Sequence, residues 1–312
     1  MGAESARITA ADFLTPPEFR CWQLSSHGAG RIGGVRLELI RRGGATRLGT
    51  CYQQVPLRVL PPFRFPGDAP ALLYLLSPTA GLLDGDAHRI DLTARAGTRT
   101  LVVGQTATRV HPCLQGFSTQ QWTIRVEAGA VLVVLPGPTI PFRGSRCYLR
   151  VEVDLDPGAA IIWGDVGWAG RYARGEESER FQFETWVQEL LVRRDGRLVF
   201  RDRSCWRGPW SEATALWHLG GHPAWGTLFA SGSIPSEILP SDPPPEQAVF
   251  PSSGGDTCVR WCGPSERVTA LVVQTALSTA ASRTAATGEA PWWREDLAPV
   301  HWFSPGCKVV RR

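Results

Sequence analysis

Hydrophobic and polar residues alternate along much of the chain, and one alternating phrase occurs three times near its middle. The copies are HRIDLTARAGTRTLVV (88–103), QWTIRVEAGAVLVVL (121–135) and CYLRVEVDLDPGAAIIW (147–163). Alternation with period two places every second side chain on one face of a strand. A short turn follows, and its glycine permits a positive φ; these glycines are Gly97, Gly129 and Gly158. The phrase predicts three successive β-hairpins, each burying its apolar face by stacking on the next.

Similar patterns predict further elements on both sides of the repeats. Val35–Arg42 reads as a strand that turns back at Gly43–Gly44, and ALLYLL at 71–76 reads as a strand buried on both faces. Phe181–Val192 alternates and is followed by Asp195-Gly196, a strong signal for a hairpin. Toward the C-terminus we expect a short helix with Ser211 as N-cap, strands at 224–231 and 257–262, and one longer helix that opens at Ser265 and ends near Gly288.

These elements define a mainly β fold of helically stacked β-hairpins in two layers, with a small helical portion at the C-terminus. Residues 1–32 are polar and broken by Pro16–Pro17, and we expect an irregular arm there. The stacked β-hairpin domain is expected at 33–233, a Pro/Ser/Gly-rich loop at 234–256, and the strand, helix and tail of the same domain at 257–312.

Composition agrees with many short strands and excludes some classes of protein. The 312 residues include 33 glycines and 25 prolines, and the net charge is only +4 with scattered arginines, so nucleic-acid binding is not indicated. No run reaches the roughly 18 apolar residues of a membrane span. The N-terminus has no apolar signal core, which predicts a cytoplasmic protein whose eight cysteines are free, mostly buried thiols.

Residues that commonly bind metals are present but badly spaced for a tight site. The six histidines include no His-x-His pair of the kind that cupin-like metal enzymes use. His218 and His222 lie four residues apart, but Gly220–Gly221 between them would break a helix. Cys258 and Cys262, on one strand, would be separated by about 13 Å. No metal site is therefore firmly assigned.

Carboxylates in the polar connections that border the repeats are more suggestive. They are Asp84, Asp86, Asp165 and Glu176. They are either solvated loop charges or a set of hard oxygen ligands along a route for a cation. Weak, exchangeable oxygen ligands suit the transfer of an ion better than tight sulfur or nitrogen cages do.

Four ordered motifs carry a resemblance to a known family. They are PTAGLLDGDAHRIDL (78–92), GQTATRV (104–110), LPGPTIPFRGSR (135–146) and GRYARGE (170–176). Together with ELIRRGGATRL followed by PLRVLPPF, they resemble the urease accessory protein UreD, called UreH in some systems. The resemblance runs from about Val35 to Thr227, with a weaker echo after Cys258.

The resemblance implies a non-enzymatic scaffold with an all-β, helically wound stack of strands. Such a scaffold binds the urease apoprotein and the accessory protein UreF, which recruits the GTPase UreG. Nickel is delivered to urease through an internal route, so Ni²⁺ would be a transient passenger and no cofactor would be tightly bound. The motif loops then become candidate partner-binding segments, with Thr79, Gly81, Thr106, Arg109, Thr139, Arg171 and Arg174 as their candidate residues.

Two alternatives from other functional classes stay open. The chain has 13 tryptophans, and a β-stack that binds carbohydrate or another ligand would use some of them. A metal-dependent β-barrel enzyme would draw its first ligands from His218, His222 and His111.

Overall fold

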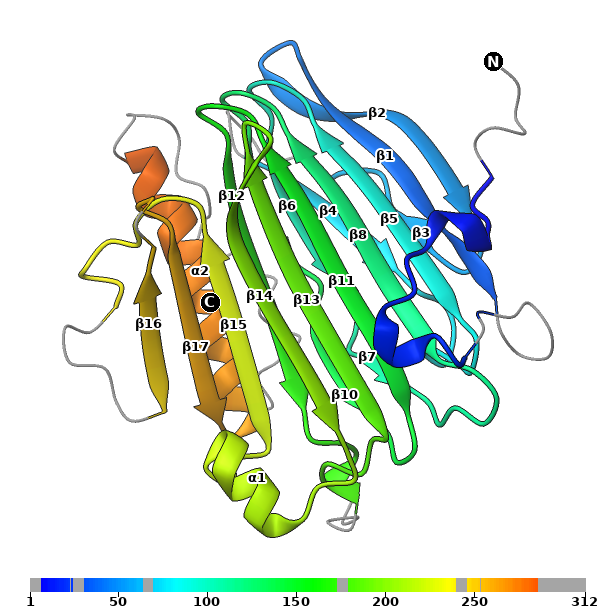
Figure 1. Ribbon diagram of the computed structural model, residues 1–312. Coiled ribbons are helices and arrows are strands. Elements are labelled where there is room, and N and C mark those ends of the chain that lie inside the picture. The colour runs from blue at the N-terminus through cyan, green and yellow to red at the C-terminus, as the bar shows by residue number, and fades with distance from the viewer. Residues whose placement is uncertain are drawn as a thin grey trace, which may run out of the picture.

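Each copy of the repeated phrase contributes one strand to each of two sheets that pack face to face (Figure 1). In this computed structural model the described residues are 7–22, 24, 31–63, 70–172, 179–239, 246–252 and 254–285. Sheet A has the order β14-β13-β11-β8-β5-β1-β2, and the main path of sheet B has the order β16-β17-β15-β12-β9-β6-β4-β3. The mainly β, two-layer fold with a C-terminal helix is thus confirmed.

The strands of sheet A are β1 (Ile32–Arg42), β2 (Ala45–Gln54), β5 (Ala87–Ala94), β8 (Ser118–Val126), β11 (Arg146–Leu155), β13 (Thr185–Arg194) and β14 (Arg197–Arg207). Those on the main path of sheet B are β3 (Arg58–Val59), β4 (Ala71–Leu76), β6 (Arg99–Gly104), β9 (Val131–Leu135), β12 (Ala160–Trp168), β15 (Ala224–Ala230), β16 (Gln247–Pro251) and β17 (Thr257–Gly263). Two short strands, β7 (Thr108–Val110) and β10 (Pro138–Pro141), pair with each other, and β10 also pairs with β12.

The pairing within the repeats differs from the predicted hairpins. The two strands of one copy do not pair with each other; β5 pairs in parallel with β8, and β8 with β11, while β6 pairs in parallel with β9, and β9 with β12. The turn glycines, with φ of 68° to 75°, carry the chain from one sheet to the other. We call this connection between the sheets a glycine arch. A hairpin and a glycine arch both consist of an alternating strand, a turn with glycine and a second strand, so the sequence pattern alone does not distinguish them.

Hydrophobic side chains form two cores, one between the sheets and one on the outer face of sheet B. Alternate residues of the parallel strands form the inner core, with Ile124, Val126 and Val153 completely buried. A second core lies where α2 (Ser265–Ala285) covers β9, β12, β15 and β17. The helix begins at Ser265 as predicted, while its predicted end near Gly288 lies outside the described residues. None of the described helices is long and apolar enough to cross a membrane.

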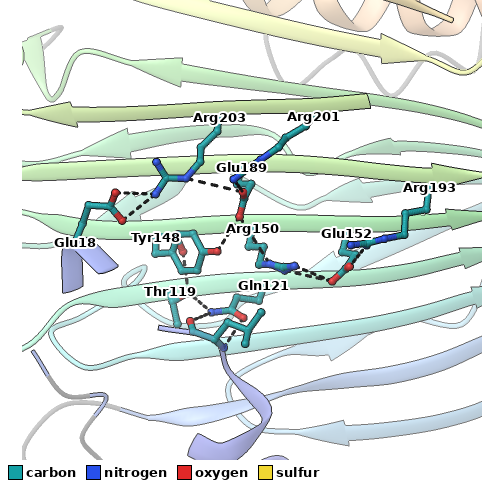
Figure 2. Close-up of polar contacts among 11 residues, drawn as sticks. Glu18, Thr119, Gln121, Tyr148, Arg150, Glu152, Glu189, Arg193, Arg201 and Arg203 are labelled. Carbon is teal, nitrogen blue, oxygen red and sulfur yellow. Dashed lines mark hydrogen bonds and ion pairs between the residues drawn. The ribbon is translucent and has the colours of Figure 1, made fainter. Parts of the chain in front are cut away.

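The described part of the N-terminal arm is tied to the outer face of sheet A (Figure 2). Phe19 is fully buried and stacks on Phe117 with ring centroids 4.7 Å apart. Glu18 accepts two hydrogen bonds of 2.8 Å from Arg203, and the backbone of Leu14 makes two hydrogen bonds with the Gln121 side chain. Residues 7–22 include two short 3-10 helices and are therefore more ordered than an irregular arm.

Most elements outside the repeats match the sequence. The hairpins β1–β2 and β13–β14 form at the predicted turns, and α1 (Glu212–Leu219) begins after Ser211, whose hydroxyl accepts from the Thr214 amide. The segment 234–256, predicted as a loop, instead contributes strand β16, which pairs with β17. The seven described cysteines are unpaired, and three of them are buried.

Candidate functional site

One row of inward-facing positions across sheet A is mostly polar. Strand register places His88, Gln120, Leu149, Gln188 and Ser204 side by side on β5, β8, β11, β13 and β14. Two residues further along the four parallel strands, the next inward row is Ile90, Trp122, Val151 and Leu190. A change from apolar to polar at the same sheet face marks a place where the core is interrupted.

Sheet B presents polar side chains opposite this row. Asp165 on β12, Thr227 on β15 and Arg260 on β17 are neighbours in register. We call the two rows together the polar seam: His88, Gln120, Gln188 and Ser204 of sheet A with Asp165, Thr227 and Arg260 of sheet B.

Three adjoining cavities follow the polar seam. The β5 cavity has a volume of about 50 Å³ and includes His88 and Gln120 in its lining. The middle cavity, about 40 Å³, is lined by Gln120, Asp165 and Gln188 among others. The β17 cavity, about 230 Å³, shares Asp165 and Gln188 with the middle cavity and extends to Arg260. Gln120 therefore borders the first two cavities, and Asp165 borders the last two.

Asp165 is the carboxylate at the centre of the polar seam. Nε1 of Trp163 donates a hydrogen bond of 2.9 Å to its Oδ2, and the Gln188 side chain also bonds to it. Burial between the sheets raises the pKa of Asp165 to about 6, although both hydrogen bonds act in the opposite direction. Near neutral pH the group is an oxygen ligand that is ionised but close to its protonation point.

The β17 cavity carries most of the remaining charge. Arg260 forms an ion pair with Asp202, which lies on β14 across the cavity. Glu246 and Cys262 also contribute to its lining. Charged groups of both signs therefore surround Asp165 at this end of the polar seam.

Two of the predicted carboxylates are used by the fold. Asp84 accepts hydrogen bonds of 2.8 to 2.9 Å from three consecutive backbone amides, those of Leu114, Gln115 and Gly116. Asp86 is buried and accepts from the amides of Arg31 and Leu83; burial raises its pKa. Neither lines the three cavities, whereas Asp165 lines two of them. Glu176 lies outside the described residues.

The predicted partner-binding residues fall into two groups. Thr79, Gly81, Thr106 and Arg109 line the β5 cavity, and Thr139 lines the middle cavity. Arg171 instead pairs with Glu179 and lies over the ring of Phe142, with 4.5 Å from its guanidinium carbon to the ring centroid. Arg174 lies outside the described residues.

The histidines suggested for a metal enzyme do not come together. His218 is on α1 and stacks on Trp210 with ring centroids 4.7 Å apart, while His222 lies beyond the left-handed Gly220 that ends the helix. His111 is bonded to the carbonyl of Ala80. Within the described ranges, no group of three His, Cys, Asp or Glu residues is placed to hold a metal ion.

Sequence reasoning missed His88, Gln120 and Gln188. Their signal was available, because each occupies an apolar phase of an alternating strand: His88 precedes Ile90 and Leu92 by two and four residues. Only the parallel register shows that these isolated exceptions lie side by side.

Known proteins are similar to this chain in sequence. The family model described as UreD urease accessory protein matches residues 31–287. A urease accessory protein UreD of Deinococcus radiodurans is 37% identical over 204 residues, which is 65% of this chain and 70% of that protein. UreD 2 of Streptomyces griseus is 32% identical over 217 residues, covering 67% and 72%, and UreD of Sorangium cellulosum is 31% identical over 266 residues, covering 81% and 82%.

The matched region contains both sheets and the polar seam from His88 to Arg260. The resemblance seen in the motif loops therefore extends over the whole described fold except the N-terminal arm. The chain belongs to the family of UreD urease accessory proteins, which act in urease maturation.

Proposed function

We propose that this protein is a non-catalytic scaffold of urease maturation that passes Ni²⁺ along the polar seam to the urease apoprotein. The observation that carries the proposal is the row of three adjoining cavities between the two sheets, with Asp165 at the junction of two of them. The ion is cargo and not a resident cofactor.

The chemistry of the polar seam suits brief binding. Asp165 supplies one carboxylate, and Gln120, Gln188 and Thr227 supply neutral oxygen atoms. Asp202 and Glu189 in the same linings are already paired with Arg260 and Arg201. Few charged ligands are therefore left for an ion, and a weak site of this kind releases an ion as readily as it binds one. The apolar row at Ile90 and Trp122 closes one side of the polar seam, so the ion would be separated from competing ligands in solution.

Motion of a few side chains would connect the cavities. Gln120 and Gln188 stand at the two junctions, and long unbranched side chains change rotamer quickly on the time scale of transfer. No movement of the strands is required.

Partners would lie at the ends of the polar seam. The loops of Thr79, Thr106 and Arg109 surround the β5 cavity, and α1 contributes His218 and Leu219 to the β17 cavity. We propose that a UreF-like protein, which brings a UreG-like GTPase, and the urease apoprotein bind these ends in the cytoplasm. Trp217, 86% exposed on α1, supplies an apolar contact.

The carbohydrate-binding alternative gains no support from the aromatic residues. Among the described tryptophans only Trp217 is exposed, and the others pack in the interior or against other side chains. A sugar platform formed by several exposed rings is therefore not seen in the described part of the chain.

The test is nickel loading of urease by a reconstituted complex that contains Asp165→Asn. Asparagine keeps the shape and the bond from Trp163 but loses the charge, so we expect assembly to be unchanged and the nickel content of urease to fall about tenfold. The matched control is Asp154→Asn, which removes a carboxylate from the outer face of sheet A. Normal nickel loading with Asp165→Asn would refute the route. Failure of wild-type protein to bind urease or a UreF-like partner would refute the scaffold.

A further inference from the structure

His88 has no structural partner that explains its place in the fold. It points inward from β5 and is 2% exposed, and its Nε2 has no hydrogen-bond partner among the described residues. A buried polar atom without a partner destabilises the folded state, because it loses its hydrogen bonds to water and gains none in the protein. The following inward positions of the same strand, Ile90 and Leu92, carry apolar side chains. An apolar side chain at position 88 would likewise leave no polar atom without a partner.

The unpartnered side chain lies at a cavity. His88 lines the β5 cavity together with Gln120, its neighbour in register on β8. A volume of about 50 Å³ is enough for a water molecule or a metal ion. Because Gln120 also borders the middle cavity, His88 stands at one end of the polar seam.

The donor set of the β5 cavity differs from that at the other end. Burial lowers the pKa of His88 to about 4, so the imidazole is neutral at physiological pH and one ring nitrogen has a free lone pair. Gln120, Thr106 and Thr108 add neutral oxygen atoms, and no carboxylate is among the described residues of this lining. Arg109 contributes to the lining but is itself exposed to solvent.

Such a donor set discriminates between divalent cations. Imidazole nitrogen suits Ni²⁺, Zn²⁺ and Cu²⁺, whereas Mg²⁺ and Ca²⁺ require oxygen ligands and usually carboxylates. A cavity with one neutral imidazole and no carboxylate offers little to a hard cation. It would therefore bind Mg²⁺ and Ca²⁺ poorly.

We propose that His88 is a transient ligand that makes the β5 cavity selective for Ni²⁺ over Mg²⁺ and Ca²⁺. The inference rests on the proposed function, because selectivity matters only if ions pass this cavity. It assigns to the polar seam a nitrogen ligand at one end and a carboxylate, Asp165, further inside.

The test is a titration of the full-length, metal-free protein with Ni²⁺, followed by NMR of its histidine side chains. Ni²⁺ is paramagnetic, so we expect the ring signals of His88 to broaden at stoichiometric metal and to stay broad in a hundredfold excess of Mg²⁺. His88→Gln should lower the affinity for Ni²⁺ at least tenfold by calorimetry. His222→Gln, a change at a half-exposed histidine, should not affect it.

Sharp His88 signals in the presence of Ni²⁺, or displacement of Ni²⁺ by Mg²⁺, would overturn the inference. The NMR result uses wild-type protein and stands even if His88→Gln does not fold. If Asp165→Asn blocks nickel loading while the His88 signals do not change with Ni²⁺, the proposed route is retained and His88 is not one of its ligands. If His88 binds Ni²⁺ but neither variant alters nickel loading of urease, the proposed route fails and the metal site remains.

Discussion

Two layers of the interior, built on the same four strands and separated by one inward row, have opposite character. The layer at Ile124 and Val153 is packed and apolar, while the layer at His88, Gln120 and Gln188 is polar and contains cavities. Inward positions recur every two residues, so these layers, two rows apart, are separated by about 13 Å along the strands. The strands are continuous through both layers, and the difference is therefore one of side chains alone.

A packed apolar layer and a layer with cavities thus coexist between the same two sheets. The apolar layer lies toward the glycine arches, and the polar seam lies toward the long connections that carry the family motifs. Stability can be concentrated in the first layer, which leaves the second free to keep unpaired polar groups and empty space. The four predictions below test this division.

The largest effect on stability is expected in the apolar layer. Ile124→Ala removes a completely buried side chain and should lower the free energy of unfolding by about 3–4 kcal/mol in urea denaturation. Gln120→Ala, two inward rows away on the same strand, should cost less than about 1 kcal/mol because it borders cavities already. Equal losses would mean that the polar seam is an ordinary part of the packed core.

Asp165→Asn should stabilise the protein at neutral pH. The pKa of Asp165 in the folded protein, about 6, is above the ordinary aspartate value of 3.8, so the wild-type carboxyl group lowers the free energy of unfolding as pH rises from about 4 to 6. The variant should gain about 3 kcal/mol at pH 7 and only about 0.5 kcal/mol at pH 4, measured by urea denaturation with a chelator present. An unchanged pH profile would show that Asp165 is well solvated.

His88→Gln should change the acid side of the same profile. The pKa of His88 in the folded protein, about 4, is below the ordinary histidine value of 6.5, so wild-type stability falls as pH decreases through this interval. Between neutral pH and pH 5 the free energy of unfolding of the metal-free wild type should fall by about 1–2 kcal/mol, and that of His88→Gln should not show this fall. The control His222→Gln should keep the wild-type pH dependence. If this variant lost it, the pH dependence would come from His222 and not from His88.

The smallest effect is expected outside both layers. Glu18→Gln weakens the ion pair to Arg203 that fastens the N-terminal arm on sheet A (Figure 2), and should cost about 0.5–1 kcal/mol. Added salt should reduce the difference between variant and wild type. A loss as large as that of Ile124→Ala would show that the arm is part of the core.

The sequence predicts the strands better than their partners. The period of two at Ile90, Leu92, Ile124 and Val126 defines strands and their buried face, and Asp195-Gly196 defines a true hairpin. The turns at Gly97, Gly129 and Gly158 have a similar local signature but lead into a different sheet. Which strand receives the hydrogen bonds depends on contacts some thirty residues away, which local periodicity does not contain.

For the candidate site, the sequence identified one residue of the polar seam that the structure also selects. Asp165 was singled out as a carboxylate, but so were Asp84 and Asp86, whose oxygen atoms hold backbone amides. In the sequence, an aspartate that binds loop amides cannot be distinguished from an aspartate that lines a cavity. Their difference lies in which donors the fold brings near, and only three-dimensional structure supplies that.

Finally, the antiparallel edges of sheet A fix a length. Beyond β1 and beyond β13 the chain reverses, so β2 and β14 end the parallel stack on both sides. From β5 to β14 the polar seam crosses four strand spacings, a span of roughly 19 Å at about 4.8 Å each. The number of strands thus sets the length of the polar seam, and one more coil between β8 and β11 would lengthen it by about 4.8 Å.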